Sequence, residues 1–267
     1  MSRPLVMGVV NVTPDSFSDG GFFLDADAAV AQARRLIAEG ADILDIGGES
    51  TRPGAAPVSV QEELARVLPV IEAVRRESAI AVSIDTMKPE AARAAMAAGA
   101  SIWNDVTALR HAPASPVMAA ELGCDVVLMH MQGEPRTMQD APRYEDVMRE
   151  VRDFLAGRAE AAMAAGVRRE AIRLDPGIGF GKTLAHNLAL LRNLPTLAEL
   201  GFPLVLGVSR KRSIQAIDPT ADDPADRLGG SLALALWCAR HGASVLRVHD
   251  VRETVQALKV QAALVGA

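Results

Sequence analysis

Two carboxylates stand directly after apolar stretches that have the length of buried strands. Asp85 follows residues 80–84 and Asp175 follows residues 171–174. Either carboxylate alone is also compatible with a helix N-cap, and Pro89, four residues after Asp85, strengthens that alternative. Together in an apolar cavity, the two would accept hydrogen bonds from a pair of N–H donors, such as a guanidine-like NH and NH₂ edge.

Two asparagines end other apolar stretches. Asn104 stands beside Asp105, and this pair is compatible either with the same polar patch or with a turn. Asn11 ends the first stretch and offers an amide oxygen, a hard ligand suited to Mg²⁺, which keeps most of its waters and commonly binds substrate phosphates. No histidine or cysteine has the spacing of a zinc site.

Four potential cations stand at or after the ends of the second, seventh and eighth apolar stretches: Arg52, Lys211, Arg247 and His249. Each alone is compatible with a surface ion pair. If the strands closed into a barrel, the four would meet at one end and favour an anion of more than one charge, because barrels often bind phosphate beside their last two strands.

Residues 177–183 read Gly-Ile-Gly-Phe-Gly-Lys-Thr and resemble a phosphate-binding loop, but the spacing is wrong. A Walker loop requires glycine where Pro176 stands, and a dinucleotide loop requires glycine where Lys182 stands. We therefore interpret the segment as a close-approach turn that presents Phe180, with Lys182 in the first turn of the next helix.

Eight such stretches alternate with helical segments, which predicts a single-domain α/β fold, an eight-stranded parallel (β/α)₈ TIM barrel over residues 1–267. The stretches are apolar rather than alternating, as strands covered on both faces should be. The predicted strands are 5–10, 42–46, 80–84, 101–103, 125–129, 171–174, 203–207 and 244–248.

The helices between them have recognisable ends. Ser59 and Glu62 form a candidate capping box, and Pro116 with Gly123 brackets the fourth helix. Longer helical stretches are predicted at 144–165, 184–200 with a bend at Pro195, 226–241 and 252–264.

Composition excludes several classes of protein. A formal charge of −5 argues against a nucleic-acid surface, and no apolar run is long enough for a membrane span or a signal peptide, so we expect a cytoplasmic protein. Cys124 and Cys238 lie in apolar contexts and are expected to be buried hydrophobic residues rather than a disulfide or metal ligands.

Two long segments are similar to the signature segments of the dihydropteroate synthase family of pterin-binding enzymes. They are Asn-Val-Thr-Pro-Asp-Ser-Phe-Ser-Asp-Gly-Gly at 11–21 and Gly-Ala-Asp-Ile-Leu-Asp-Ile-Gly-Gly-Glu-Ser-Thr-Arg-Pro-Gly at 40–54. The similarity continues in order through 83–86, 104–105, 175–182, 209–211 and 247–250, and so covers essentially the whole chain.

The resemblance implies a homodimeric barrel that condenses 4-aminobenzoate with 6-hydroxymethyl-7,8-dihydropterin pyrophosphate, using Mg²⁺ and releasing pyrophosphate. Carried over by position, the pterin site is Asp85, Asn104, Met129, Asp175, Phe180, Gly207 and Lys211. The pyrophosphate and Mg²⁺ site is Asn11, Arg52, Arg247 and His249, with Asn11 as the metal ligand. The aminobenzoate side is Phe17, Thr51 and Pro53 on loops. Asp85, Lys211, Arg247 and His249 are expected to act in catalysis.

One position departs from the family pattern. Arg212 follows Lys211 where some members have serine near the aminobenzoate carboxylate, which leaves open how that carboxylate is held. The alternatives are a pterin-binding methyltransferase that uses methyltetrahydrofolate, a catalytically silent pterin-binding paralogue, or a general phosphate-binding barrel. The first has no use for the pyrophosphate residues, and the second would have lost them.

Overall fold

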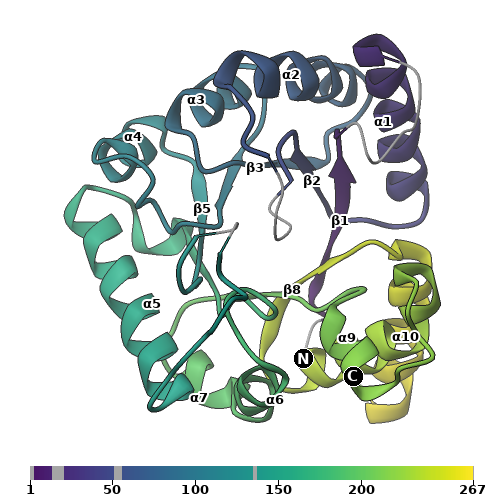
Figure 1. The fold of residues 1–267 in the computed structure, drawn as a ribbon. Helices are drawn as coiled ribbons and strands as arrows, with labels where there is room; N and C mark the ends of the chain where they lie inside the picture. Colours follow the sequence, from purple (N-terminus) through teal and green to yellow (C-terminus); the bar gives the residue numbers. More distant parts are fainter. Residues whose placement is uncertain (1–2, 14–20, 51–55, 135–136, 267) are drawn as a thin grey trace.

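The computed structural model describes residues 3–13, 21–50, 56–134 and 137–266, with the side chains of residues 21–25 left aside. Eight parallel strands close into a barrel in chain order, so the predicted fold class is confirmed (Figure 1). The strands are β1 (Leu5–Asn11), β2 (Ile43–Gly47), β3 (Ala81–Asp85), β4 (Ile102–Asp105), β5 (Asp125–Met129), β6 (Ile172–Asp175), β7 (Leu204–Gly207) and β8 (Ala243–Val248).

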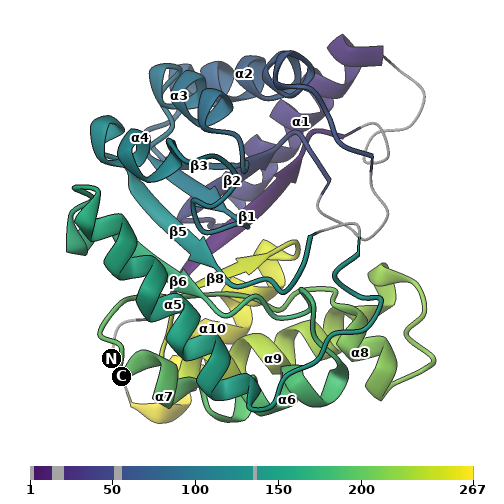
Figure 2. The same ribbon diagram turned by 60° about the vertical axis from the view of Figure 1, so that its left-hand side comes forward.

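Helices surround the barrel on its outside (Figure 2). They are α1 (Gly21–Ala38), α2 (Val60–Glu77), α3 (Pro89–Ala97), α4 (Ser115–Leu122), α5 (Val147–Ala164), α6 (Leu184–Arg192), α7 (Leu194–Ala198), α8 (Arg212–Ile217), α9 (Leu228–Arg240) and α10 (Val251–Val265). Short 3₁₀ turns, η2 (Arg169–Ala171) and η3 (Pro224–Arg227), precede β6 and α9. No helix in the described ranges is long and apolar enough to cross a membrane.

Several helix ends follow the local sequence. Ser59 caps α2 by accepting a hydrogen bond from Glu62 N at 3.2 Å, but the Glu62 carboxylate accepts from Arg66 at 2.5 Å, so the residues do not form the full predicted box. Gly123 ends α4 in the left-handed region, which glycine adopts without steric strain. The stretch 184–200 divides at Asn193 into α6 and α7, where the bend at Pro195 was predicted.

Two helical predictions were wrong in detail. The segment expected as one helix from residue 226 begins as the 3₁₀ turn η3, and α9 starts at Leu228. Lys182 does not belong to a helix, because Thr183 caps α6 and the helix begins at Leu184. The Lys182 side chain turns back instead, toward the glycine-containing segment before it.

The strand register decides which side chains enter the barrel. Parallel pairing aligns Gly47 with Asp85 and Asp85 with Asn104, and it aligns Gly207 with Arg247. Successive side chains in a strand point to opposite faces, so alternate residues of each strand enter the interior. One interior layer is apolar and consists of Met7, Ile43, Ala81, Ile102, Val127, Val205 and Val245.

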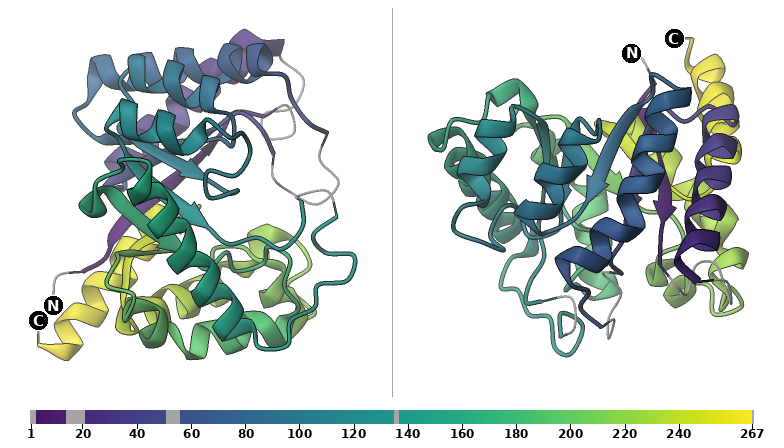
Figure 3. Two further views of the ribbon diagram at one scale, coloured as in Figure 1. Left: turned by 90° about the vertical axis from the view of Figure 1, so that its left-hand side faces the viewer. Right: turned by 90° about the horizontal axis from the view of Figure 1, so that it is seen from above.

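The other strand faces pack against the helices and form the main hydrophobic core. Trp103, Leu128 and Leu174 are completely buried there, and the Trp103 indole donates to Thr86 O at 2.8 Å. Because this apolar shell and the interior layer hold the strands from both sides, their carboxyl ends form a rigid rim. Both termini lie at the opposite end of the barrel from the loop between β5 and α5 (Figure 3).

Candidate active site

Arg247 lies at the centre of a charged cluster inside the carboxyl end of the barrel. Its Nε donates to Asp45 Oδ2 at 2.6 Å and its Nη2 to Asp85 Oδ2 at 2.7 Å. Asn104 Nδ2 donates to the same Asp45 oxygen at 3.1 Å. Side chains from β2, β3, β4 and β8 are therefore joined by hydrogen bonds at one end of the barrel.

Asp45 is the functional candidate that the sequence analysis did not select. Its side chain is completely buried, and its Oδ1 has no hydrogen-bond partner in the described part of the chain. Asp45 lies within β2, two residues before the last residue of the strand. It opens the polar residues that end this apolar stretch, but it was not selected as a site residue. A charged residue inside the apolar stretch 43–47 was the available indication, because burying an aspartate requires a partner.

Lys211 approaches the cluster from the loop after β7. Its ammonium lies 4.4 Å from the centre of the Phe180 ring, a cation–π contact. Asp175 lies at the end of β6, and its Oδ1 accepts from Gly177 N at 2.7 Å. Asp175, Arg247 and Asp85 all act electrostatically on Lys211, so these four charged groups lie near one another.

Apolar side chains line one side of this space. Val106, Met129, Met131 and Met138 form a small buried cluster, and Phe180 packs against it. Gly207 is aligned with Arg247, and a Cβ built on it would lie 4.0 Å from Arg247 Cδ. The site thus combines an apolar wall with carboxylates and an ammonium, which suits a heterocycle with polar edges.

Burial and charge shift the titration of these groups. Burial raises the pKa of Asp85 to about 7, against the effect of Arg247, and burial also raises the pKa of Asp175. Burial lowers the pKa of Lys211 to about 8. Burial lowers the pKa of Arg247, but the neighbouring Asp45 and Asp85 carboxylates raise it by more, so the guanidinium stays charged.

A second polar region lies beside Arg247 at the ends of β1 and β8. Asn11 is half-buried at the end of β1, in register with Gly47. His249 N donates to Ser209 Oγ at 3.2 Å, and His249 Nδ1 lies 3.1 Å from the same oxygen. Burial and the neighbouring Arg247 lower the pKa of His249 to about 3, so its imidazole is neutral.

The structure resolves the two alternatives for Asn104 and Asp105. Asn104 faces the charged cluster, whereas the Asp105 carboxylate accepts from Thr107 N at 2.7 Å and Leu109 N at 2.8 Å within the following loop. Adjacent strand residues point to opposite faces, so only one of the pair reaches the site. Asp105 shapes a turn.

Four predicted site residues, Phe17, Thr51, Arg52 and Pro53, lie outside the described residues. Cys124 and Cys238 are buried as predicted, and burial raises the pKa of these thiols to about 11 and about 12. Neither is a nucleophile at neutral pH.

No group of three or more His, Cys, Asp or Glu side chains in the described ranges could hold a metal ion. The donor set at the end of β1 nevertheless fits a hard cation with few protein ligands. Asn11 offers one amide oxygen, and Mg²⁺ normally keeps several waters and binds one or two protein groups plus substrate phosphates.

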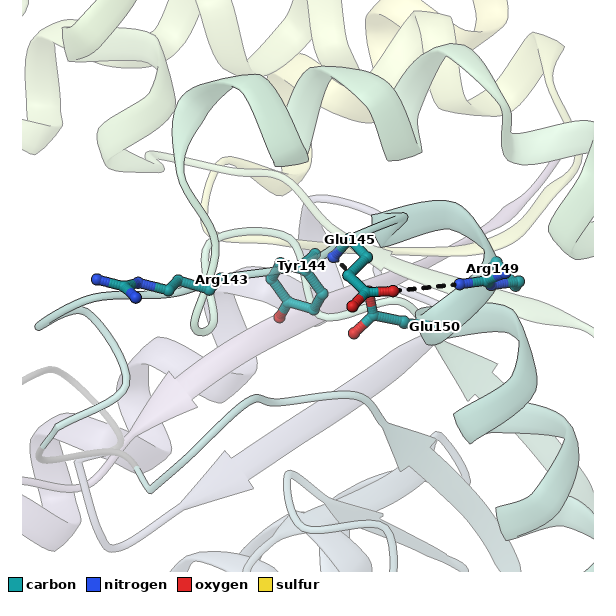
Figure 4. Close-up of a pocket in the computed structure, with 5 residues that line it drawn as sticks. All are labelled: Arg143, Tyr144, Glu145, Arg149 and Glu150. Atoms are coloured by element: carbon teal, nitrogen blue, oxygen red, sulfur yellow. Dashed lines mark hydrogen bonds and ion pairs between the residues drawn. The ribbon is translucent and has the colours of Figure 1, made fainter.

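A shallow hollow on the outside of the barrel is a different kind of feature. Arg143, Tyr144, Glu145, Arg149 and Glu150 line it at the start of α5 (Figure 4). Its charges serve the helix end, since Glu150 Oε1 accepts from Glu145 N at 2.8 Å, and Arg149 lies 3.9 Å from Glu145. We assign it no ligand.

A barrel with a buried cluster of carboxylates and cations at its carboxyl end is the architecture of a TIM-barrel enzyme. The chain belongs to the pterin binding enzyme family, which matches residues 7–249. This confirms the family predicted from the sequence, and with it a transferase of the dihydropteroate synthase type.

The relatives are similar over nearly their whole length. Dihydropteroate synthase of Escherichia coli strain K12 is 48% identical over 100% of this chain and 94% of its own. A structure of Xanthomonas albilineans dihydropteroate synthase with 4-aminobenzoic acid is 53% identical, with a TM-score of 0.93 over 99% of this chain and 94% of that one.

A third relative is the Yersinia pestis dihydropteroate synthase in a sulfonamide drug complex. It is 46% identical, with a TM-score of 0.93 over 99% of this chain and 95% of that one. The methyltransferase and the silent paralogue find no support in these similarities.

Proposed function

We propose that this chain condenses 6-hydroxymethyl-7,8-dihydropterin pyrophosphate with 4-aminobenzoate to form 7,8-dihydropteroate and pyrophosphate in folate biosynthesis. The observation that carries the proposal is the cluster around Arg247, where cations for an anionic leaving group meet carboxylates for a heterocycle's N–H edge. The 4-aminobenzoic acid in the Xanthomonas structure supports the second substrate.

The pterin is proposed to bind on the apolar wall. The N–H groups of its amino-pyrimidine edge are proposed to donate hydrogen bonds to Asp85 and Asp175, and the Asn104 amide adds a further hydrogen-bonding group. Met129, Phe180 and Gly207 line the ring, and Lys211 donates to the polar atoms of the opposite edge. Phe180 is held against Lys211, so ring and cation form one preorganised surface.

The pyrophosphate is proposed to lie toward β1 and β8. The two bonds of Arg247 to aspartates leave its Nη1 free of carboxylate partners in the described part of the chain, and a guanidinium has five N–H donors in all. Arg247 and Arg52 would stabilise the charge that develops on the leaving group, and His249, with its neutral ring, would donate a hydrogen bond. One such donor contributes about 10²–10³ in rate.

In the reaction, the C–O bond between the pterin methylene and pyrophosphate breaks, and its electron pair leaves with pyrophosphate. A C–N bond forms to the arylamine, which then loses one proton. Asp45, Asp85 and Asp175 all lie near Arg247, and in their ionised forms they would stabilise positive charge on the methylene. Phe17, Thr51 and Pro53 are proposed to hold the aminobenzoate.

Mg²⁺ is proposed as the cofactor, with Asn11 as its protein ligand. The bound cation would neutralise part of the pyrophosphate charge. Removing divalent cations is then expected to weaken binding of the pterin pyrophosphate, and Asn11→Ala is expected to raise the Mg²⁺ concentration needed for half-maximal rate. An unchanged Mg²⁺ dependence in that variant would exclude Asn11 as the ligand.

We also propose a cytoplasmic homodimer in which residues 1–267 of each subunit form a single domain. An apolar groove between α9 and α10 supports it, lined by Leu236, Val260, Leu264 and Val265 among others. Leu264 is 82% exposed and Val260 57%, and an exposed apolar patch of this kind is typical of a protein–protein interface. A second copy of the chain is the proposed occupant.

The direct test supplies both substrates and Mg²⁺ to the purified chain and detects dihydropteroate together with equimolar pyrophosphate. A folded protein that forms neither product would refute the proposed function. Sulfonamides are expected to compete with 4-aminobenzoate, since the Yersinia enzyme was solved in complex with one. Inhibition that higher concentrations of 4-aminobenzoate do not relieve would count against the aminobenzoate assignment.

A further inference from the structure

The turn at residues 177–181, called here the glycine turn, is built by close backbone approach. Gly177, Gly179 and Gly181 all have positive φ, at 67°, 85° and 60°. A Cβ built on Gly177 would lie 1.9 Å from His130 O, and one on Gly181 would lie 2.6 Å from Gln132 O. The turn after β6 thus packs against the loop after β5 with no room for a side chain at Gly177 or Gly181.

Side chains from outside the turn bind most of its carbonyl groups. Lys182 Nζ donates to Gly177 O at 3.0 Å and to Phe180 O at 2.9 Å. Gln139 Nε2 donates to Gly179 O at 2.6 Å, and the Tyr144 hydroxyl to Gly181 O at 2.7 Å. The shape of the turn is therefore set by three donors in addition to its glycines.

Lys182 is the unusual member of this group because its amino group is buried among neutral acceptors, and burial lowers its pKa to about 7. Its side chain is 3% exposed, and no carboxylate in the described ranges lies within ion-pair distance of its ammonium. Its remaining contacts are His130 O at 3.3 Å and His130 Nδ1 at 2.9 Å. Burial lowers the pKa of His130 to about 3, so that ring is neutral and Nδ1 accepts.

A lysine needed only for stability is poorly suited to this position, since an apolar side chain of similar volume fills a buried site without the desolvation penalty. What Lys182 does that an apolar side chain cannot do is hold carbonyl groups of two loops around one ammonium. Those loops meet directly under the pterin side of the candidate active site.

The glycine turn supports three groups of that side. Phe180 belongs to it and stacks on Lys211 at 4.4 Å. A Cβ on Gly179 would lie 3.3 Å from Lys211 Cδ, so the turn also borders the lysine stem. Gly177 N donates to the Asp175 carboxylate at 2.7 Å. A change in the turn would therefore displace an aromatic wall, a cation and a carboxylate together.

We propose that Lys182 is a positioning residue for pterin recognition, fixing the glycine turn so that Phe180, Lys211 and Asp175 keep the geometry that binds the heterocycle. The inference rests on the proposed function, because it assigns the pterin to this side of the site. Lys182 acts through the turn and touches no substrate.

The first test measures steady-state kinetics of Lys182→Met. The KM for the pterin pyrophosphate is expected to rise about ten- to a hundredfold, the range for losing hydrogen bonds from a charged donor, while the KM for 4-aminobenzoate changes less than about threefold. Arg169→Met is the matched control, because Arg169 donates to Leu200 O and Gly201 O at the start of β7, the other end of the barrel. That variant is expected to leave both KM values unchanged.

The second test is a double-mutant cycle on the pterin KM. Lys182→Met and Phe180→Ala are expected to be non-additive, because both act through the same turn, whereas Lys182→Met and Asn11→Ala are expected to be additive. Tyr144→Phe removes one hydrogen bond to Gly181 O without a large cavity and should raise the same KM about two- to fivefold. This variant tests the idea even if Lys182→Met fails to fold.

The possible outcomes separate a positioning role of Lys182 from a purely structural one. If wild type forms dihydropteroate but Lys182→Met and Tyr144→Phe keep the wild-type pterin KM and lose only thermal stability, Lys182 is a structural residue and the inference is overturned. Equal increases in both KM values would also overturn it. If folded wild type forms no dihydropteroate, the proposed function fails first, and the inference fails with it.

Discussion

Replacing Asp45 with asparagine tests whether the buried aspartate orients Arg247 for the leaving group. Asp45 Oδ2 accepts from Arg247 Nε at 2.6 Å and from Asn104 Nδ2 at 3.1 Å, and the residue is completely buried. The substitution keeps the size of the side chain and one carbonyl oxygen, but removes the negative charge. Arg247 then keeps a full ion pair only with Asp85.

The magnitude follows from the kind of bond that is lost. A hydrogen bond to a charged group contributes about 1.5–3 kcal/mol and a neutral one about 0.5–1.5 kcal/mol, so the asparagine costs about 1–2 kcal/mol. In kcat/KM this corresponds to a decrease of about 5- to 30-fold. Asp45→Ala removes the acceptor entirely. Breaking a buried ion pair costs about 3–5 kcal/mol, and because Asp85 still pairs with Arg247 we expect the lower value, about 3 kcal/mol, which is a decrease of about 100-fold in kcat/KM.

The assay is steady-state release of pyrophosphate with both substrates varied, together with calorimetric titration of inorganic pyrophosphate. Asp42→Asn is the matched control, because Asp42 pairs with Arg3 at 2.7 Å just before the same strand, at the other end of the barrel. It is expected to leave kcat/KM unchanged. Thermal unfolding of each variant separates loss of fold from loss of the site.

Two results would refute the role of Asp45 in orienting Arg247. If Asp45→Asn and Asp45→Ala bind pyrophosphate as wild type does and turn over within about twofold of it, the carboxylate does not orient Arg247 for catalysis. A drop in stability alone would assign Asp45 to the barrel interior rather than to the reaction.

Three further predictions concern the same chain. The kcat/KM is expected to rise as pH increases through the Asp85 pKa of about 7, since the carboxylate must be ionised to accept, and to fall through the Lys211 pKa of about 8, since the ammonium must be protonated. A flat pH profile would contradict this assignment. Phe180→Leu removes a cation–π contact of about 0.5–2 kcal/mol and should raise the pterin KM about 2- to 30-fold, whereas an unchanged KM would remove Phe180 from the wall. Leu264→Glu should convert a dimer to a monomer by light scattering, and a monomeric wild type would refute the dimer.

The fold was predictable because its signals are local. Apolar stretches such as residues 80–84 and 125–129 carry the pattern of strands buried on both faces, and each ends in polar residues. Parallel strands present their carboxyl ends on one side, so the convergence of Asp85 and Arg247 follows from chain order once the barrel closes.

Which residues belong to the site was less predictable, because it depends on the direction in which each side chain points. Asn104 and Asp105 are neighbours with opposite roles, and only the register of β4 against β3 decides between them. Asp45 was not selected because its role depends on Arg247 and Asn104, which are 202 and 59 positions away in the sequence. Lys182 was expected in a helix, whereas its side chain turns back to bind His130, 52 residues away in the sequence, a tertiary effect that spacing does not encode.

The crowding at Gly177 and Gly181 limits what mutation can do to this enzyme. Even a methyl group there would collide with main-chain oxygen atoms of His130 and Gln132, and main chain cannot swing aside as a flexible side chain does. Saturation libraries should therefore recover no functional replacement at either codon. An inhibitor that contacts Gly177 and Gly181 would therefore bind a surface at which point substitutions can hardly produce resistance.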